Sequence, residues 1–555
     1  MSYNSFDIRE CQPGKSFFEL RGKVWFAGSR NNNRPFHRLC SLMRKMGAVR
    51  VVVETLDIRK DCDIRQEIKA LEIYYQSKDL NPTIFRLTFI RSEVASIEQL
   101  MSLDDSAFLA SAIVINICPF GNNWDSYIWE AIVTLPHLFN SDSTPQVVPM
   151  LNNYYHVSKT FERHIEVEGG KITFNIRGSF FCQQNRATSV CAHAAIQTLV
   201  NNAFNLSTNN TLRSEEINQS LGIDHKLHKI DRGLNFGQMH QVLTKSPLNC
   251  RLKTIDFTKQ QETNYIEMLH HLIESKCPCL LTFTTSRPDE SHVVAVIGHT
   301  LNSDSWHPEA QLAFARERSR LNYLSSAQWI DHFIINDDQF GMYYCLAVNT
   351  LRKDPSISKD MTFRAGCLFA VVPSDGFEIS PDQAEKIAVT TVRNLLYHLE
   401  KNNPNLFNQF PWFTEMKPTQ LAPIVVRTAL LNKDRYERHL RKRSQRSKSA
   451  HQHKDFLGNA FSTDQIKWIV QDLPNYFWLT EISLPDIFMA NKNKLIDVII
   501  SKDSHGDSAG YNYNVLFIRL PGIGIKPNKN ETQILNVTSH YPLFRVDPDL
   551  PTLEW

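Results

Sequence analysis

Short apolar runs that alternate with segments of helical spacing are the feature that most restricts the fold of this chain. Within the first 150 residues the strand-like runs are 23–28, 49–55, 84–90 and 111–117, and the helix-like segments are 35–46 and 64–76. Strands and helices that alternate in this way pack as mixed layers, with helices against the faces of a sheet. We therefore expect an α/β region at the N-terminus.

Chain length and the later pattern divide the sequence into four expected regions. At roughly 150 residues per domain, 555 residues correspond to about three or four domains. The expected regions are an N-terminal α/β region at 1–150, a central region at 151–375, a helical segment with a basic stretch at 376–455, and a β-rich subdomain at 456–555. Helical and strand-rich stretches follow one another, so the expected fold class is α+β.

Charge balance and cysteine content restrict the environment and the partners. Lys and Arg number 61 and Asp and Glu 58, and the net charge of +3 gives no global reason to expect nucleic acid or a membrane as partner. The longest apolar stretch, 110–117, is far shorter than the roughly 18–20 residues of a membrane span. Eleven scattered cysteines and an N-terminus without a signal-like pattern predict a reduced, cytoplasmic protein.

The stretch 181–202 is the most informative one for chemistry. Thr188 or Ser189 is a suitable N-cap, and the helical spacing that follows places Cys191 in the first turn of a helix. Unpaired N–H groups at a helix start favour a thiolate there. The alternative interpretation is an unreactive core cysteine, because free cysteines are among the most buried residues.

Upstream of this cysteine, two glutamines offer side-chain amides. Gln183 and Gln184 lie in a turn before the expected helix. An amide N–H beside the backbone N–H of Cys191 is what an oxyanion hole requires.

Two later segments offer partners for the thiol. His292 opens the apolar strand 292–298 after a polar loop, and an imidazole in that position is able to act as a general base. Asp337 is expected to orient that imidazole, and Asn336 is the alternative because an amide oxygen also accepts an imidazole N–H. The alternatives without a catalytic role are a histidine at the end of a loop, for His292, and an ordinary hairpin turn, for the segment that holds Asp337. His299 lies on the opposite face of its strand and is the weaker candidate.

The order of these elements resembles the papain-like cysteine peptidase superfamily, and more closely its bacterial branch that includes the bacteriocin leader peptidases. The pieces that carry the resemblance are Gln183-Gln184-Asn185, Cys191-Ala-His-Ala-Ala, Ser291-His292-Val-Val-Ala-Val-Ile-Gly and Phe333-Ile-Ile-Asn-Asp337. The second piece is also similar to the deubiquitinating Josephin domains. The resemblance extends over residues 154–375.

The resemblance implies a papain-like core that cleaves an amide or isopeptide bond of a protein or peptide through a thioester. It implies Cys191 as nucleophile, His292 as general base, Asp337 as orienting residue and Gln184 as oxyanion donor, with no cofactor and no metal ion. The family commonly places this glutamine about six residues before the cysteine, whereas Gln184 lies seven and Gln183 eight residues before Cys191, so the assignment stays open between the two. Two other functions stay open: a catalytically latent papain-like binding or scaffold protein, and a thiol acyltransferase.

A basic stretch at 435–454 holds eight Lys or Arg residues, with Tyr436 as its only Phe, Tyr or Trp. Like charges repel one another, so we expect an exposed charged helix or mobile loop outside the core. The alternative is electrostatic docking to an acidic partner or to nucleic acid.

Overall fold

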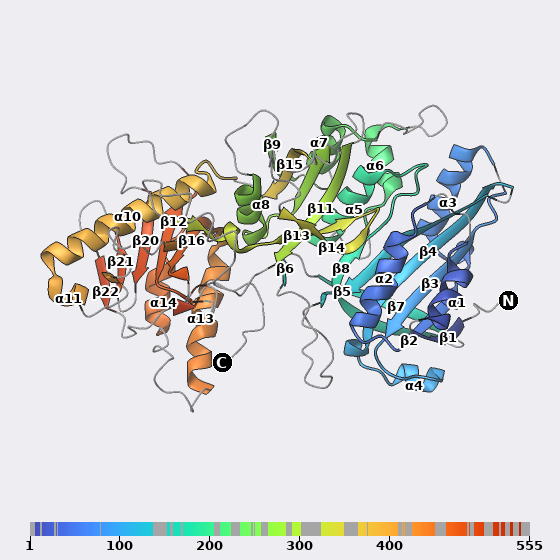
Figure 1. Ribbon diagram of the computed structural model, residues 1–555, viewed down its shortest axis with the longest axis horizontal. Coiled ribbons are helices and arrows are strands. Elements are labelled where there is room, and N and C mark those ends of the chain that lie inside the picture. The colour runs from blue at the N-terminus through green and yellow to red at the C-terminus, as the bar shows by residue number, and fades with distance from the viewer. Residues whose placement is uncertain are drawn as a thin grey trace. The chain divides into compact units, whose positions relative to one another are not determined.

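The chain is an α+β protein in the computed structural model (Figure 1). The structure describes residues 6–11, 14–26, 29, 31–77, 79–121, 123–136, 153–155, 159–167, 170–204, 211–223, 233–245, 248, 250–256, 265–284, 291–300, 323–348, 364–373, 376–408, 413–414, 416, 424–449, 462–485, 488, 493–503, 514–520, 523–527, 533–536 and 543–544. For residues 120, 123, 153–155, 284, 364, 406, 442–449, 493, 535–536 and 543–544 it describes the backbone alone. Two compact units divide the chain. The N-terminal unit comprises Met1–Gln261, Pro278–Gly298 and His332–Val372, and the C-terminal unit comprises Glu262–Cys277, His299–Asp331 and Pro373–Trp555.

An antiparallel sheet of seven strands forms the first part of the N-terminal unit. Its order is β1-β2-β3-β4-β5-β8-β7. The strands are β1 (Phe6–Glu10), β2 (Arg50–Thr55), β3 (Thr83–Ile90), β4 (Phe108–Phe120), β5 (Asn123–Thr134), β7 (Lys159–Val167) and β8 (Gly170–Phe181).

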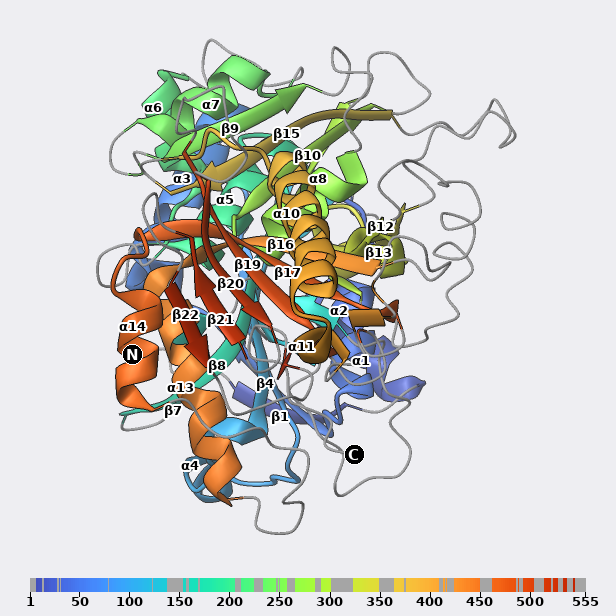
Figure 2. The same ribbon diagram turned by 90° about the vertical axis from the view of Figure 1, so that its left-hand side faces the viewer.

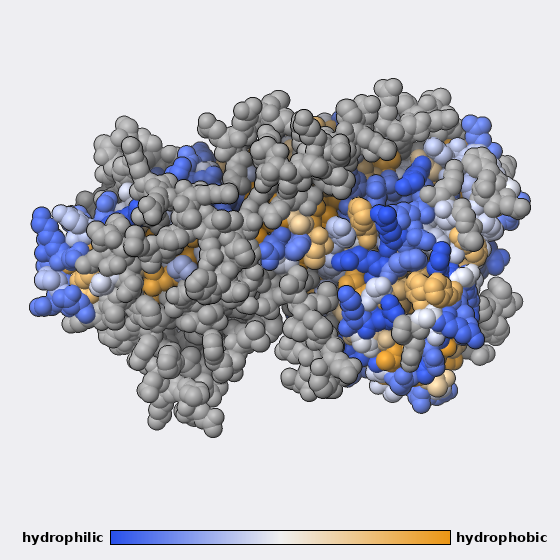
Figure 3. Space-filling model, in the orientation of Figure 1, coloured by the Kyte–Doolittle hydropathy of each residue, from blue (hydrophilic) through white to orange (hydrophobic). Residues whose placement is uncertain are grey.

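Helices cover both faces of this N-terminal sheet because successive strand residues point to opposite faces. On β4, Ala112 and Val114 pack with α1 (Lys15–Val24) and α2 (Arg34–Lys45), which lie over one face in Figure 1. Ile113 and Ile115 pack instead with α3 (Cys62–Tyr75). A short helix, α4 (Ile97–Met101), precedes β4. In Figure 3, the described surface over α1–α3 is mostly hydrophilic with small hydrophobic patches.

A central sheet in the same unit has the order β14-β13-β11-β10-β15-β9, and β6 (Asn153–Tyr155) pairs with β11. The strands are β9 (Arg251–Asp256), β10 (Cys279–Thr284), β11 (Ser291–Thr300), β13 (His332–Asp337), β14 (Gly341–Ala347) and β15 (Arg364–Val372). The helices α5 (Cys191–Ala203), α6 (Ser214–Leu221) and α7 (Phe236–Thr244) bury apolar side chains with Leu280, Ala295 and Phe369 of this sheet. The segment 182–190 joins β8 of the first sheet to α5.

A third sheet, of order β12-β16-β17-β19-β20-β21-β22, lies in the C-terminal unit. Its strands are β12 (Tyr323–Ser325), β16 (Ile424–Asn432), β17 (Tyr476–Ser483), β19 (Ile496–Ser501), β20 (Val515–Leu520), β21 (Ile523–Lys526) and β22 (Gln533–Asn536). The remaining elements of the unit are α8 (Tyr265–Glu274), α10 (Pro381–Asn402), α11 (Pro404–Asn408), α13 (Lys433–Ser449), α14 (Thr463–Val470), β18 (Asn493–Lys494) and β23 (Leu543–Phe544).

Helices also cover both faces of this third sheet. The helix α10 lies across one face (Figure 2), where Trp478 of β17 and Val498 of β19 are buried. The neighbouring strand residues Phe477 and Ile499 pack with α13 and α14 instead. The period-two pattern of the strands therefore supports a helix–sheet–helix layering within this unit.

The strand expected at 23–28 is wrong. Lys23 and Val24 end helix α1, and Val24 is buried one turn after Leu20. Residues four apart lie on the same helix face, so these apolar positions form a helical stripe. Residues 27 and 28 lie outside the described part of the chain.

The structure also draws the region boundaries differently. The N-terminal sheet continues past residue 150, because β8 pairs with β5 and β7 with β8. Strand β16, which lies in the segment expected to be helical, pairs with β17 of the expected β-rich subdomain. Strand β12, which lies in the expected central region, also pairs with β16.

The basic stretch is helical over 435–449, which agrees with the expected charged helix, but its start is buried in the core, contrary to expectation. Tyr436 and Leu440, one turn apart on α13, are almost completely buried and pack against the third sheet. Residues 450–454 lie outside the described residues. Electrostatic docking by the stretch stays a prediction.

None of the helices within the described ranges is long and apolar enough to cross a membrane.

Candidate active site

The segment 182–190 before α5 is a tight turn organised by Asn185. The Asn185 Oδ1 atom accepts hydrogen bonds from the backbone N–H groups of Ala187 (2.8 Å), Thr188 (2.9 Å) and Ser189 (2.9 Å). Its Nδ2 donates to the buried carboxylate of Glu67 at 2.8 Å. One buried amide thus fixes the backbone immediately before the helix.

Cys191 is the first residue of α5, as the sequence predicted. The ring of His193 accepts a hydrogen bond from the N–H of the N-cap residue Val190 at 3.4 Å, and its Nε2 donates to Asn218 Oδ1 at 2.9 Å. His193 is completely buried, whereas Cys191 is half-buried. The sulfur therefore lies at the positive end of the helix dipole, on a rigid support.

The expectation that Thr188 or Ser189 caps this helix is wrong. The N-cap is Val190, which has no side-chain acceptor. Thr188 and Ser189 are buried and lie in the turn before the helix, where their backbone N–H groups donate to Asn185 Oδ1.

Cys191, His292 and Asp337 come together within the N-terminal unit. The His292 Nε2 atom lies 3.1 Å from Asp337 Oδ2, and His292 also hydrogen-bonds the Cys191 thiol. Since Asp337 faces Nε2, the nitrogen left for the thiol is Nδ1. The other Asp337 oxygen accepts from the N–H groups of Gln339 (2.8 Å) and Phe340 (3.1 Å). Asp337 therefore closes the hairpin turn and orients the imidazole at the same time.

The electrostatics of the site favour a charged imidazole. Burial alone would lower the pKa of His292, but hydrogen bonds with Asp337 and Cys191 and the charges of Asp338 and Asp337 raise that pKa well above its ordinary value. An imidazolium beside a sulfur stabilises a thiolate.

Asp338 is a member of the site that the sequence did not single out. It is 4% exposed, its Oδ1 lies 3.6 Å from His292 Nε2, and neither of its oxygens has a hydrogen-bond partner within the described residues. Burial raises the pKa of Asp338 to about 7, and the charge of Asp337 adds to this while His292 opposes it. An Asp in an Asn-Asp-Asp turn has no local signal that separates this role from that of a turn residue.

The structure also distinguishes the alternatives that the sequence left open. The Asn336 amide donates to Ser179 Oγ (3.0 Å) and Phe180 O (3.1 Å), and its oxygen accepts from the Tyr343 N–H, so it is engaged away from His292.

Gln183 and Gln184 also differ in whether the side-chain amide is already hydrogen-bonded within the protein. The Gln183 amide oxygen accepts from the Ile128 N–H, and its Nε2 donates to Asn32 O at 2.8 Å. Gln184 is half-buried and makes no side-chain hydrogen bond to a described residue. Of the two amides, Gln184 is the one available to a ligand, and its oxyanion role stays a prediction.

Two groups within the described residues bring three metal-ligating side chains within 4.8 Å of one another. One is His292, Asp337 and Asp338, where Asp337 already accepts three hydrogen bonds. The other lies in the C-terminal unit and is formed by His270, Glu274 and His299.

Comparison with family models, with curated proteins and with solved structures finds no match for this chain.

Proposed function

We propose that this protein is a papain-like cysteine hydrolase that cleaves an amide or isopeptide bond of a protein or peptide. The observation that supports the proposal is the hydrogen-bonded series Cys191–His292–Asp337, with the cysteine at the start of a helix. A nucleophile, a base within hydrogen-bond reach and a third group that orients the base are the requirements of nucleophilic acyl transfer.

The chemistry assigns one task to each residue. The Cys191 thiolate attacks the carbonyl carbon, and the negative charge moves to the carbonyl oxygen. His292 then gives its proton to the leaving nitrogen, so that the amine departs and a thioester remains on Cys191. Water, deprotonated by His292, hydrolyses the thioester and restores the thiol. Asp337 holds the imidazole in place throughout.

The carbonyl oxygen needs hydrogen-bond donors as its charge develops. The first N–H groups of a helix have no partner within the helix, so the Cys191 N–H is one donor. The Gln184 amide is the proposed second donor, since Gln183 is bound to Asn32 and Ile128.

The test is site-resolved thiol labelling of the full-length protein. Limiting iodoacetamide near neutral pH, followed by peptide mapping, gives the alkylation rate of each cysteine. Cys62 and Cys345 are the matched controls: Cys62 is exposed and donates to Asp63, which raises its pKa, and Cys345 is half-buried with a pKa raised by burial. If His292 activates the thiol, Cys191 is labelled before both controls despite its lower exposure than Cys62. First labelling of Cys62, with a Cys191 rate that His292→Gln leaves unchanged, would refute the proposal.

A peptide-derived acyl electrophile separates an enzyme from a latent binding protein. We expect it to modify Cys191 and to leave Cys191→Ser unmodified. Rapid iodoacetamide labelling of Cys191 without any reaction with acyl electrophiles would favour the binding or scaffold function instead. Formation of a new amide with added amine would favour acyl transfer.

A further inference from the structure

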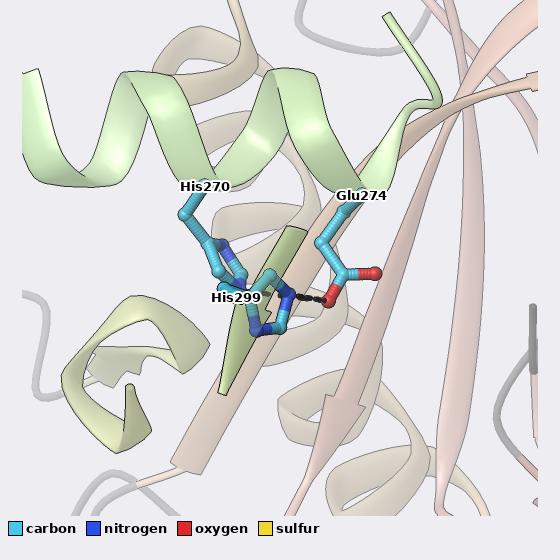
Figure 4. Close-up of side chains that lie close together, drawn as sticks. All are labelled: His270, Glu274 and His299. Atoms are coloured by element: carbon cyan, nitrogen blue, oxygen red, sulfur yellow. Dashed lines mark hydrogen bonds and ion pairs between the residues drawn. The ribbon is translucent and has the colours of Figure 1, made fainter. Parts of the chain in front are cut away.

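Three metal-ligating side chains meet in the interior of the C-terminal unit. His270 and Glu274 lie one turn apart on α8, and His299 faces them from the end of β11 (Figure 4). All three are buried, with exposed fractions of 1%, 3% and 0%. Glu274 Oε1 lies 2.8 Å from His299 Nε2 and 3.6 Å from His270 Nε2.

The hydrogen bonds of His299 require a positive charge between its ring and Glu274. Its Nδ1 lies 2.9 Å from the Thr300 carbonyl oxygen, and its Nε2 lies 2.8 Å from the Glu274 carboxylate. Both oxygens only accept hydrogen bonds, whereas a neutral imidazole has a single N–H. With Nδ1–H donating to Thr300, the Nε2 lone pair would face a carboxylate lone pair. A proton or a metal ion at this position removes the repulsion.

His270 is the second, independent observation. It is almost completely buried, yet its ring makes no hydrogen bond to any described residue: Nε2, which faces Glu274, lies 3.6 Å from the carboxylate oxygen, beyond hydrogen-bond distance. A buried polar group without a partner is costly and calls for a ligand that the protein atoms do not supply. The His270 and His299 rings lie 5.0 Å apart between centroids, and both approach the same carboxylate oxygen.

We propose that His270, Glu274 and His299 bind a divalent transition-metal ion, with Zn²⁺ as the preferred ion. Imidazole nitrogens and a carboxylate oxygen are suitable ligands for Zn²⁺. Ligands about 2.0–2.1 Å from a tetrahedral ion lie about 3.4 Å from one another, and the measured 2.8 and 3.6 Å bracket that separation.

The surroundings supply outer contacts to two of the three ligands, His299 and Glu274. The Thr300 carbonyl accepts from His299 Nδ1, which leaves Nε2 for the metal. Arg427 donates to the second Glu274 oxygen through Nε (3.2 Å) and Nη2 (2.5 Å), so this carboxylate is held in orientation.

The ion would join α8 to the end of β11 within the C-terminal unit, and a water molecule would complete the tetrahedral set. Three protein ligands with water is the ligand count of catalytic zinc sites, but the burial of all three side chains keeps this ion from a bulky substrate, so we assign it a structural role. The inference is independent of the proposed hydrolase function, since Cys191 supplies no ligand.

The metal alone is the probe for the test. The full-length protein is stripped with chelator, dialysed and titrated with Zn²⁺ against a chromophoric competitor, and a parallel sample is loaded with Co²⁺. We expect one Zn²⁺ per chain, a higher melting temperature with Zn²⁺ than with Mg²⁺, and a tetrahedral Co²⁺ spectrum without thiolate charge-transfer bands. A spectrum with thiolate bands, or the absence of Zn²⁺ binding, would overturn the proposal.

Three variants locate the ion. His270→Gln should weaken Zn²⁺ binding by at least about 100-fold, because loss of even an outer-shell contact costs about 10–100-fold. His271→Gln is the matched control, a buried histidine one position along α8 whose Nδ1 lies 3.1 Å from Thr428 O. Asp338→Asn tests the other candidate group. Zn²⁺ binding retained in His270→Gln, or lost only in Asp338→Asn, would disprove the assignment.

The wild-type measurements remain decisive if His270→Gln fails to fold. Imidazole ¹⁵N spectra of the wild-type protein with Zn²⁺ should then show metal-bound nitrogens. A His299 ring with protons on both nitrogens would mean a simple ion pair with Glu274 and would refute the metal site.

Discussion

His292 and His299 lie near the two ends of the same strand, β11, and each approaches a buried carboxylate through Nε2. They differ in what faces the other ring nitrogen. For His292 it is the thiol of Cys191, and for His299 it is the carbonyl oxygen of Thr300. A thiol is able to give up a proton, whereas a carbonyl oxygen only accepts one.

The two carboxylates differ as well. Asp337 uses its second oxygen to close a turn of its own strand, while Glu274 gives its second oxygen to Arg427. The first arrangement places an imidazole beside a half-buried thiol, and the second places a histidine, a carboxylate and an arginine in the interior. A histidine–carboxylate pair is therefore not evidence of catalysis until the partner of the second nitrogen is known.

The largest expected effect is on thiol reactivity. His292→Gln should lower the labelling rate of Cys191 near pH 7 by about 10–30-fold, because a thiol with the ordinary pKa of about 8.5 is only about 3% thiolate at that pH. His299→Gln should leave the rate within about twofold, since its two ring nitrogens face the Thr300 carbonyl oxygen and the Glu274 carboxylate. Rates from peptide mapping check both variants. Equal losses in the two variants would abolish the contrast between the two histidines.

The loss of unfolding free energy should instead be larger at the Glu274 site than at the Asp337 site. Glu274→Gln leaves Arg427 without one of its buried partners, and such a loss costs about 3–5 kcal/mol of unfolding free energy. Asp337→Asn keeps an oxygen for the turn N–H groups, so we expect a smaller loss, on the order of 1 kcal/mol. Denaturant titration measures both. A larger loss for Asp337→Asn would mean that His292 is also part of a structural ion pair.

A third prediction concerns the turn that presents the cysteine. Asn185→Ala leaves three buried N–H groups without an acceptor, and an unsatisfied buried group costs about 1–3 kcal/mol. We expect a lower stability together with slower labelling of Cys191, and Asn185→Asp should restore much of both. Normal labelling in Asn185→Ala would show that α5 alone positions the thiol.

Much of the fold could be predicted from sequence because its signals are local. The strands at 84–90 and 111–117 and the helices at 35–46 and 64–76 have regular apolar periods, and the structure places β3, β4, α2 and α3 there. The pairing of β8 with β5 could not be read in the same way, because that contact links segments far apart in the chain.

The candidate site likewise has residues that local sequence patterns could predict and residues that they could not. Cys191, His292 and Asp337 each begin or end a regular element, so the pattern around each could be recognised. Asn185 has no signal of its own in the sequence beyond its place after the two glutamines, and its bonds to three following N–H groups replace the expected N-cap arrangement. For His299, strand alternation indicated the opposite face but could not reveal its partner, Glu274, which comes from a separate helix.

The smallest expected effect is a change in the pH dependence of stability at Asp338. Its folded pKa of about 7 lies above its ordinary value, so the folded state holds a proton that the unfolded state has released. This contribution to stability is present below about pH 4 and is lost as the pH rises toward 7, with the slope set by the difference in bound protons. In Asp338→Asn the free energy of unfolding should therefore fall less between pH 4.5 and 6.5 than it does in the wild-type protein. His292 does not contribute to the difference in this range, because its raised pKa keeps the ring charged. Denaturant titrations of both proteins across this range measure the difference, with the exposed Asp79→Asn as control. Parallel pH curves for wild type and Asp338→Asn would show that Asp338 is ionised in the folded site, paired with His292 as Asp337 is.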